Sequence, residues 1–196
     1  MIKEKAALIF FCFFLTIFIL LFSYKTTLYF SELTPEQKNT IDFLSNKEDF
    51  DNKEELKINY TTAELSHLED VRKVMKVIDY FFYVSLLIVT ATLTFHRKNK
   101  EKTKKLLKYG GITAVLFVLA VLLFSLVSFD ISFTLFHQVF FPQGNWIFPA
   151  DSLLIRTFPL EFFVKISRSI LVQAFLWGMI FILLSYFLLK LRKKRV

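Results

Sequence analysis

The sequence predicts an all-α membrane protein: a single membrane domain over residues 1–196, with four transmembrane helices, both termini cytoplasmic and a small extracellular cap. Three observations predict this class. Of the 196 residues, 55% are hydrophobic and 26 are Phe, which is more apolar surface than a soluble domain of this size can bury. Four apolar runs of roughly 20 residues are each long enough to cross a hydrocarbon core about 30 Å thick. The basic residues behind the net charge of +8 gather beside these runs.

The apolar runs define the spans. The first run follows Lys3 and Lys5. It is too long for a signal peptide, and it lacks the cleavage site of one. The second carries Asp79, to which the sequence assigns no role. The lone Cys12 excludes an intramolecular disulfide. The runs predict spans at about 6–28, 74–95, 110–129 and 170–189.

The charge of the connecting segments predicts the orientation. The segments 96–105 and 190–195 are rich in Lys and Arg, and the positive-inside rule places both in the cytoplasm. Nucleic-acid binding is not expected, because no aromatic residues interleave with these clusters. The extracellular cap is then formed by 31–73 and 130–167. The first of these holds 11 acidic and 6 basic residues, as an exported segment would.

The outer segment 31–73 is too long for a simple connector and carries structural signals of its own. Thr34, Pro35 and Gln37 form a typical helix start, with an N-cap, a proline at the first helical position and a capping box. Apolar and polar residues alternate over 56–60, which predicts a short extended piece.

A second capping box is formed by Thr61 and Glu64. From Leu65 to Ile78, apolar residues recur at three- and four-residue spacing and run straight into the second span. We therefore expect one continuous helix that projects above the membrane.

His67 lies on this projecting helix. It precedes the span by about seven residues, which places it roughly 10 Å above the hydrocarbon edge at 1.5 Å per residue. Glu64 and Asp70 lie three residues to either side, within reach on a helix surface. Taken alone, such a pattern is more often a solvated helix face than a site.

A second histidine, His137, favours a functional site over a solvated helix face at His67. The segment 129–141 is predicted to continue the third span outward as a helix, on which Asp130, Thr134 and His137 share one face. His137 is about eight residues beyond the span, nearly the height of His67. The third histidine, His96, is expected to be a bystander at the inner surface.

Aromatic residues crowd around this second histidine. They are typical of an interfacial belt at the headgroup level, and equally of an aromatic-lined acyl pocket. The candidate substrate-binding residues are Phe133, Phe136, Phe140, Phe141, Trp146 and Phe162.

The candidate chemistry is acid–base catalysis by two imidazoles, which take up and return protons near pH 7. The sequence has no nucleophile elbow, phosphate loop, HExxH helix or CxxC pair. A zinc site made of two histidines with Glu64, Asp70 or Asp130 is an alternative. The helix faces offer no tight ligand spacing for it, so neither metal nor cofactor is expected.

Two stretches of the sequence resemble the signatures of a known family, the lipoprotein intramolecular transacylases (Lit) of Gram-positive bacteria. The first stretch is Phe129-Asp130…His137-x-x-Phe140-Phe141…Trp146…Pro149, ending Phe158-Pro159-x-Glu161-Phe162-Phe163; the second is Glu64-Leu-Ser-His67-Leu-Glu-Asp70-Val71. The four-span plan with an outer cap matches over essentially the whole chain.

The resemblance implies a reaction, a substrate and a place. A diacylglyceryl-modified N-terminal cysteine of a lipoprotein would transfer its sn-2 acyl chain to its own α-amino group, giving the lyso-form. The partners would be that lipoprotein N-terminus and membrane lipid, at the extracellular face of the bacterial plasma membrane. The functional histidines of the family fall on His67 and His137, which are the expected catalytic residues.

This reaction agrees with the residue-level interpretation, because the substrate supplies both nucleophile and acyl donor. One histidine would deprotonate the amine and the other would protonate the departing glycerol oxygen, supported by Glu64, Asp70 or Asp130. Two alternatives stay open: an intermolecular, phospholipid-dependent acyltransferase, and a non-enzymatic membrane binding or sensor protein.

Overall fold

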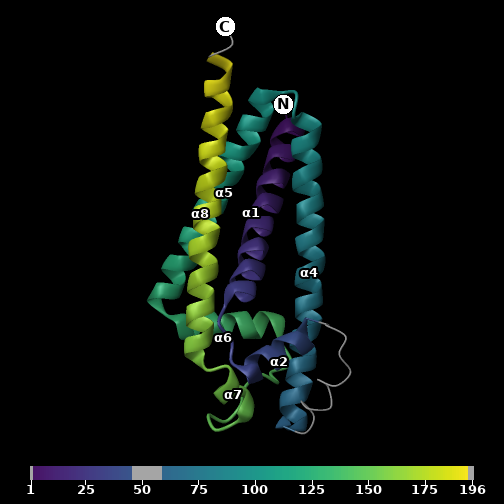
Figure 1. Cartoon of the computed structure of the whole chain (residues 1–196), viewed down its shortest axis with the longest axis vertical. Coiled ribbons are helices and arrows are strands. Elements are labelled where there is room, and N and C mark those ends of the chain that lie inside the picture. The colour runs from purple at the N-terminus through teal and green to yellow at the C-terminus, as the bar shows by residue number, and fades with distance from the viewer. Residues whose placement is uncertain (1, 46–58, 194–196) are drawn as a thin grey trace. The chain divides into compact units, whose positions relative to one another are not determined.

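The computed structural model describes residues 2–45 and 59–193, and the secondary structure in these ranges is helical, with no strand (Figure 1). Residues 56–58 of the predicted extended piece lie outside the described residues. The helices are α1 (Ile2–Phe30), α2 (Pro35–Leu44), α4 (Thr62–His96), α5 (Lys100–Val127), α6 (Phe129–Phe140), α7 (Leu153–Thr157) and α8 (Leu160–Lys193).

Within the described residues, four helices are long and apolar enough to cross a membrane, which confirms the predicted number of spans. They are α1, α4, α5 and α8. The cytoplasmic placement of both termini and the extracellular placement of the cap stay predictions.

Helix α4 is much longer than a bilayer requires. Its 35 residues extend for about 52 Å, against a hydrocarbon core of about 30 Å. All of its charged side chains, Glu64 and Asp70 among them, lie in the first five turns, residues 62–79, whereas 80–95 contains none. We therefore expect the first turns to lie outside the hydrocarbon. As the periodicity predicted, the helix continues into the span without a break.

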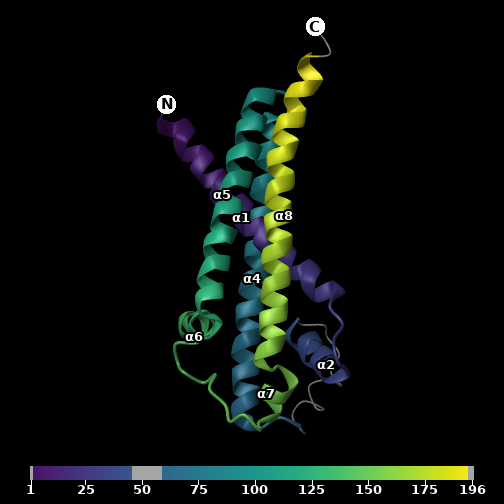
Figure 2. The same cartoon turned by 90° about the vertical axis from the view of Figure 1, so that its left-hand side faces the viewer.

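The chain forms two compact units, of which the first contains 1–29, 80–123 and 168–196. Here α1 crosses α5 and α8 obliquely (Figure 2). Small residues allow the close approach: a Cβ at Gly111 of α5 would lie 2.8 Å from the carbonyl oxygen of Gly178 in α8. The core of this unit consists of Phe11, Leu15, Ile19, Val89, Leu106, Ala114, Val118, Leu171 and Ala174.

The second unit contains 30–79 and 124–167, and therefore α2, the charged turns of α4, α6 and α7. The capping box of Thr34 and Gln37 forms as predicted. The Gln37 side chain also donates a 2.8 Å hydrogen bond to the backbone oxygen of Thr157, which ties α2 to α7. The core of this unit consists of Phe43, Leu44, Tyr60, Leu68, Leu154 and Phe158.

The prediction that 129–141 continues the third span was wrong. Helix α5 ends at Val127, and Ser128 adopts an extended conformation with φ −161° and ψ 107°. Its hydroxyl accepts a 3.3 Å hydrogen bond from the backbone N–H of Ile131 and so caps a separate helix, α6. The apolar periodicity crosses this break, which is why it was not visible in the sequence.

Candidate active site

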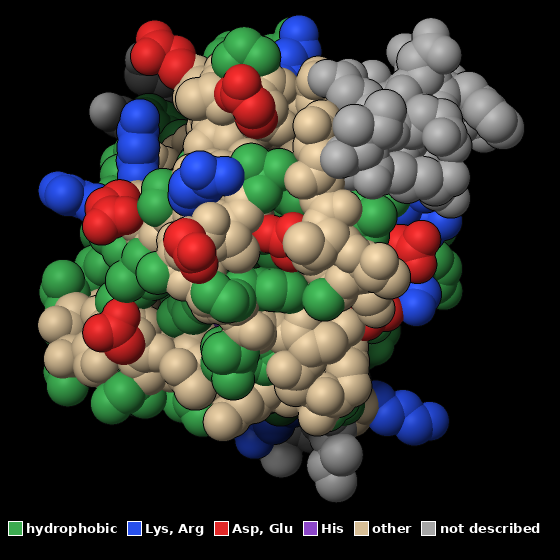
Figure 3. Space-filling view, turned by 90° about the horizontal axis from the view of Figure 1, so that it is seen from below, with side chains coloured by type: hydrophobic (Ala, Val, Ile, Leu, Met, Phe, Trp, Pro, Cys, Tyr) green, Lys and Arg blue, Asp and Glu red, His purple; other side chains and the backbone are tan. Residues whose placement is uncertain are grey.

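The structure brings the two outer histidines together. The ring centroids of His67 on α4 and His137 on α6 lie 6.4 Å apart, with 27° between the ring planes. Both side chains are buried, at 6% and 8% relative exposure. Viewed from the end that carries α2 and α7, the surface shows acidic side chains scattered among apolar ones and no exposed imidazole (Figure 3).

The backbone of α6 fixes the ring of His137. Its Nδ1 lies 2.8 Å from the backbone oxygen of Phe133, one helical turn earlier. A carbonyl oxygen only accepts, so Nδ1 must carry the hydrogen in this bond. In the neutral ring, Nε2 then holds the free lone pair and can take up a proton.

Aromatic rings surround both imidazoles. The centroids of Phe133 and Trp146 lie 4.0 and 4.8 Å from that of His137. Phe141, at 3% exposure, contacts both histidine rings, with its centroid 4.9 Å from His67 and 5.6 Å from His137. Three of the predicted aromatic residues therefore form the wall of the histidine pair.

The other three predicted aromatic residues are less enclosed or make no contact with the pair. The ring of Phe136 lies edge-on at 5.5 Å from that of His137 and packs on Phe140, and these two side chains are 47% and 43% exposed. Among the described residues, Phe162 packs against Phe158 and Phe163 and makes no ring contact with either histidine.

Phe148, which the sequence did not single out, lies 5.7 Å from the ring of His67. It belongs to the loop between α6 and α7, where no periodicity indicates which side chains point inward. Only its place within the Trp146–Pro149 run of the family signature could have suggested it.

Burial sets the charge state of the pair. Burial, and next the nearby His137, lower the pKa of His67 to about 4, while Asn145 and Asp70 act in the opposite direction. Burial also lowers the pKa of His137, against the bond to the Phe133 carbonyl. Both imidazoles are therefore neutral at pH 7, as a general base must be.

Glu64 lies three residues before His67 in the sequence, but its carboxylate binds backbone N–H groups. Its Oε1 accepts a 2.8 Å hydrogen bond from the N–H of Leu154, and its Oε2 accepts two 2.8 Å bonds from the N–H and hydroxyl of Thr61. Burial acts to raise the pKa of this carboxyl, but these hydrogen bonds outweigh it and lower the pKa. The carboxylate thus caps α4 and binds the start of α7, and it makes no hydrogen bond to His67.

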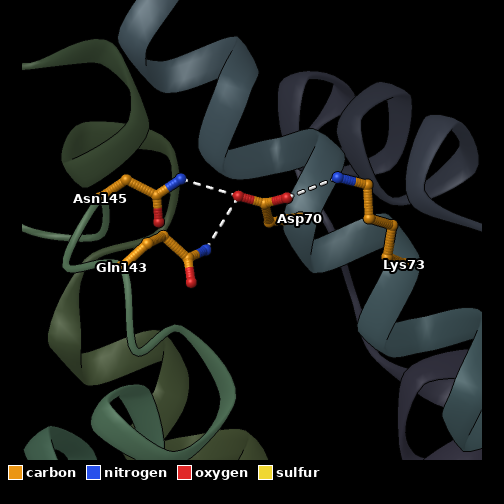
Figure 4. Close-up of polar contacts among 4 residues, drawn as sticks. All are labelled: Asp70, Lys73, Gln143 and Asn145. Atoms are coloured by element: carbon orange, nitrogen blue, oxygen red, sulfur yellow. Dashed lines mark hydrogen bonds and ion pairs between the residues drawn. The ribbon is translucent and has the colours of Figure 1, made fainter.

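Asp70 faces the loop that follows α6. Its Oδ2 accepts bonds of 2.9 and 2.8 Å from the side-chain amides of Gln143 and Asn145, and its Oδ1 pairs with Lys73 at 2.8 Å (Figure 4). Lys73 first and Asn145 next lower its pKa, so it is a carboxylate at neutral pH. Neither amide residue was predicted from the sequence to have a role.

Asp130 is not part of the histidine pair. It is exposed, and together with Ile131, Thr134 and Leu135 it borders a shallow depression whose lining contains neither histidine. Within 2–45 and 59–193, no three His, Cys, Asp or Glu side chains come together in a way that could hold a metal ion.

These features define the class: a multi-pass helical membrane protein with a buried pair of neutral histidines in an aromatic enclosure. The sequence profile of the lipoprotein intramolecular transacylase Lit matches residues 5–163. The chain belongs to this family of membrane-integral, lipoprotein-processing transacylases, as its two signature stretches indicated.

Solved structures share the fold over nearly the whole chain. The membrane integral Lit of Bacillus cereus superposes with a TM-score of 0.84 at 20% identity, covering 98% of each chain. Structures of the same protein with a histidine replaced by Arg or by Ala give TM-scores of 0.80 and 0.79, also at 20% identity. They cover 99% and 98% of this chain and 95% and 96% of theirs.

An uncharacterized protein of Aquifex aeolicus (strain VF5) is 26% identical over 121 residues, which are 62% of this chain. The match spans about half of that relative, 54% of its length.

Proposed function

We propose that this protein is a lipoprotein intramolecular transacylase of the outer surface of the bacterial plasma membrane. It would move the sn-2 acyl chain of a diacylglyceryl-cysteine lipoprotein onto the α-amino group of the same cysteine, leaving the lyso-form. The observation that carries this proposal is the buried, neutral His67–His137 pair, with rings 6.4 Å apart, in a chain of the Lit family.

The obstacle to this reaction is geometric. The attacking nitrogen, Cα, Cβ, sulfur, two glycerol carbons, the ester oxygen and the carbonyl carbon close an eight-membered ring, which is entropically unfavourable in free solution. Holding the two reacting groups together can recover on the order of 7–11 kcal/mol. The aromatic wall of Phe133, Phe141 and Trp146 supports such a role, because it gives a folded-back lipid an apolar enclosure around the two bases.

The proton balance suits two neutral imidazoles. The substrate enters as an ammonium group, with a pKa near 8, and must lose two protons to become an amide. One histidine takes the first proton and frees the lone pair of the amine, which attacks the ester carbonyl. The other histidine takes the second proton from the tetrahedral intermediate. This second histidine then passes its proton to the departing glycerol oxygen, and the first returns its own proton to solvent.

Mass spectrometry tests the proposal. The chain is co-expressed with a tagged lipoprotein in a host that makes the diacylglyceryl form, and the N-terminal lipopeptide is fragmented. We expect an unchanged parent mass, with one acyl chain on nitrogen and one on glycerol. We expect the product to fall by at least about 100-fold in His67→Gln and His137→Gln, since a positioned general base contributes roughly 10²–10⁴-fold.

His96→Gln is the matched control, because His96 ends α4 far along the helix from His67 and should leave the product unchanged. An added acyl mass would instead support the intermolecular, phospholipid-dependent enzyme. An unmodified substrate would contradict the proposal and favour a binding or sensor protein. Full activity in both histidine variants would contradict the role given to the histidine pair.

A further inference from the structure

Two buried polar atoms beside the histidine pair have no hydrogen-bond partner: Nδ1 of His67 and Oδ1 of Asn145. Buried polar atoms are nearly always paired, so two such atoms in one site call for an explanation. They are complementary, because an imidazole Nδ1 can carry a hydrogen and an amide oxygen accepts one.

The orientation of the Asn145 amide follows from Asp70. A carboxylate only accepts, so the amide must turn its nitrogen toward Asp70, to which it donates the 2.8 Å hydrogen bond (Figure 4). Its oxygen is then directed away from Asp70 and lies in the buried interior. Asp70 is itself held by Lys73 and by Gln143, so the amide is anchored to a fixed carboxylate.

The two atoms also belong to side chains that already interact. Burial and His137 lower the pKa of His67, while the side chain of Asn145 raises it, which is the direction expected of a hydrogen bond to the ring. A hydrogen bond from Nδ1–H to Oδ1 would satisfy both atoms at once.

We infer that Asn145 is a positioning residue for His67: held by Asp70, it accepts the Nδ1–H of the imidazole and so leaves Nε2 as the proton-accepting nitrogen. His137 obtains the same tautomer from the carbonyl of Phe133. Both rings of the pair would then present Nε2 as the base, one fixed by its own helix and the other by a side chain from a distant loop. The catalytic consequence rests on the proposed function, but the tautomer does not.

Nitrogen NMR of histidine-labelled protein in detergent or nanodiscs, at pH 7 and without substrate, tests the inference. The signals are assigned with His67→Gln and His137→Gln. In the unsubstituted protein we expect Nδ1 of His67 to be protonated and Nε2 unprotonated. Asn145→Ala should shift the ring toward the Nε2–H tautomer, while the signals of His137 stay in place and report an intact fold.

Gln143→Ala is the matched control. Gln143 donates a 2.9 Å hydrogen bond to the same Oδ2 of Asp70 from the same loop, but its side-chain oxygen is not a buried acceptor without a partner. It should leave the tautomer of His67 unchanged. An Nε2–H tautomer in the unsubstituted protein, or an equal effect of Gln143→Ala and Asn145→Ala, would overturn the inference.

Asn145→Gln provides a second measurement in case the alanine variant disturbs the loop. It keeps both the amide N–H for Asp70 and the oxygen for Nδ1–H, so the Nδ1–H tautomer of His67 should persist. The same tautomer in Asn145→Ala, Asn145→Gln and the unsubstituted protein would show that position 145 does not contact the ring. In the transacylase assay, Asn145→Ala should lower turnover by roughly 10- to 100-fold, the size of effect found when the partner that orients a metal-binding histidine is removed. Loss of the tautomer effect would overturn this inference alone, whereas an inactive unsubstituted protein would overturn only the proposed function.

Discussion

The imidazole rings of His67 and His137 lie 6.4 Å apart, one on α4 and the other on α6, and both are buried. Phe141, which is the C-cap residue of α6, contacts both rings. Burial lowers the pKa of both rings, and the neighbouring His137 lowers that of His67 further, so the pair stays neutral at pH 7 and is sensitive to acid.

This sensitivity predicts a loss of stability in mild acid. The pKa of His67 is about 4 in the folded protein, against about 6.5 when unfolded, so the unfolded chain binds the proton more tightly. The contribution of the neutral ring is complete above pH 6.5 and is lost as the pH falls toward 4, by at most about 3 kcal/mol. Thermal unfolding in detergent between pH 7 and pH 4 measures this loss of stability. The decline should be shallower for His67→Gln and unchanged for His96→Gln; equal slopes in all three proteins would contradict the assignment.

The Glu64 carboxylate predicts a structural phenotype. Glu64→Ala leaves the backbone N–H groups of Thr61 and Leu154 without their acceptor, so we expect a loss of about 3 kcal/mol or more. Glu64→Gln keeps one acceptor oxygen and should cost less. The free energy of unfolding in detergent measures both. Glu69→Ala is the control, because Glu69 is exposed on the same helix and should change it by less than about 0.5 kcal/mol. A similar loss of stability in Glu69→Ala would show that the hydrogen bonds of Glu64 are not what stabilises the fold.

The lowered pKa of Glu64 adds a pH dependence of its own. Its contribution is complete above the ordinary carboxyl pKa of 4.5 and is lost as the pH falls below that value, lower than the range in which His67 acts. At pH 3 the difference between Glu64→Gln and the unsubstituted protein should therefore shrink. A constant difference from pH 7 to pH 3 would contradict this.

Asp130 is expected to be dispensable for the chemistry. It is exposed and borders a depression that contains neither histidine. Asp130→Ala should keep turnover within about threefold of the unsubstituted protein, since surface changes away from a site have small effects. The mass-spectrometric assay measures this, with His137→Gln as the inactive reference. A loss of tenfold or more would place Asp130 in the reaction.

The close contact of α5 with α8 predicts a packing defect. A Cβ at Gly111 would lie 2.8 Å from the backbone oxygen of Gly178 and from Cγ1 of Ile182, and backbone cannot move aside as a flexible side chain can. Gly111→Val should destabilise the protein by about 1–3 kcal/mol. Ala120→Val, on an exposed position of the same helix, is the control. Equal thermal stability of the two variants would contradict this packing.

The sequence by itself determined the number of spans, the continuous α4 and both capping boxes. A bilayer demands a run of apolar residues of fixed length, and a helix cap depends on residues three positions apart, so both can be recognised from neighbouring residues alone. The two histidines were found in the same way, because each follows or precedes a span at a countable distance.

Only the tertiary structure decided which neighbours serve those histidines. It showed that Glu64 binds the backbone of Leu154, that Phe148 lies against His67 and that Asp70 holds Asn145. The break at Ser128 was also hidden, because apolar residues continue on both sides of it. These features depend on contacts between segments far apart in the chain, and hydrophobic periodicity carries no information about which of them meet.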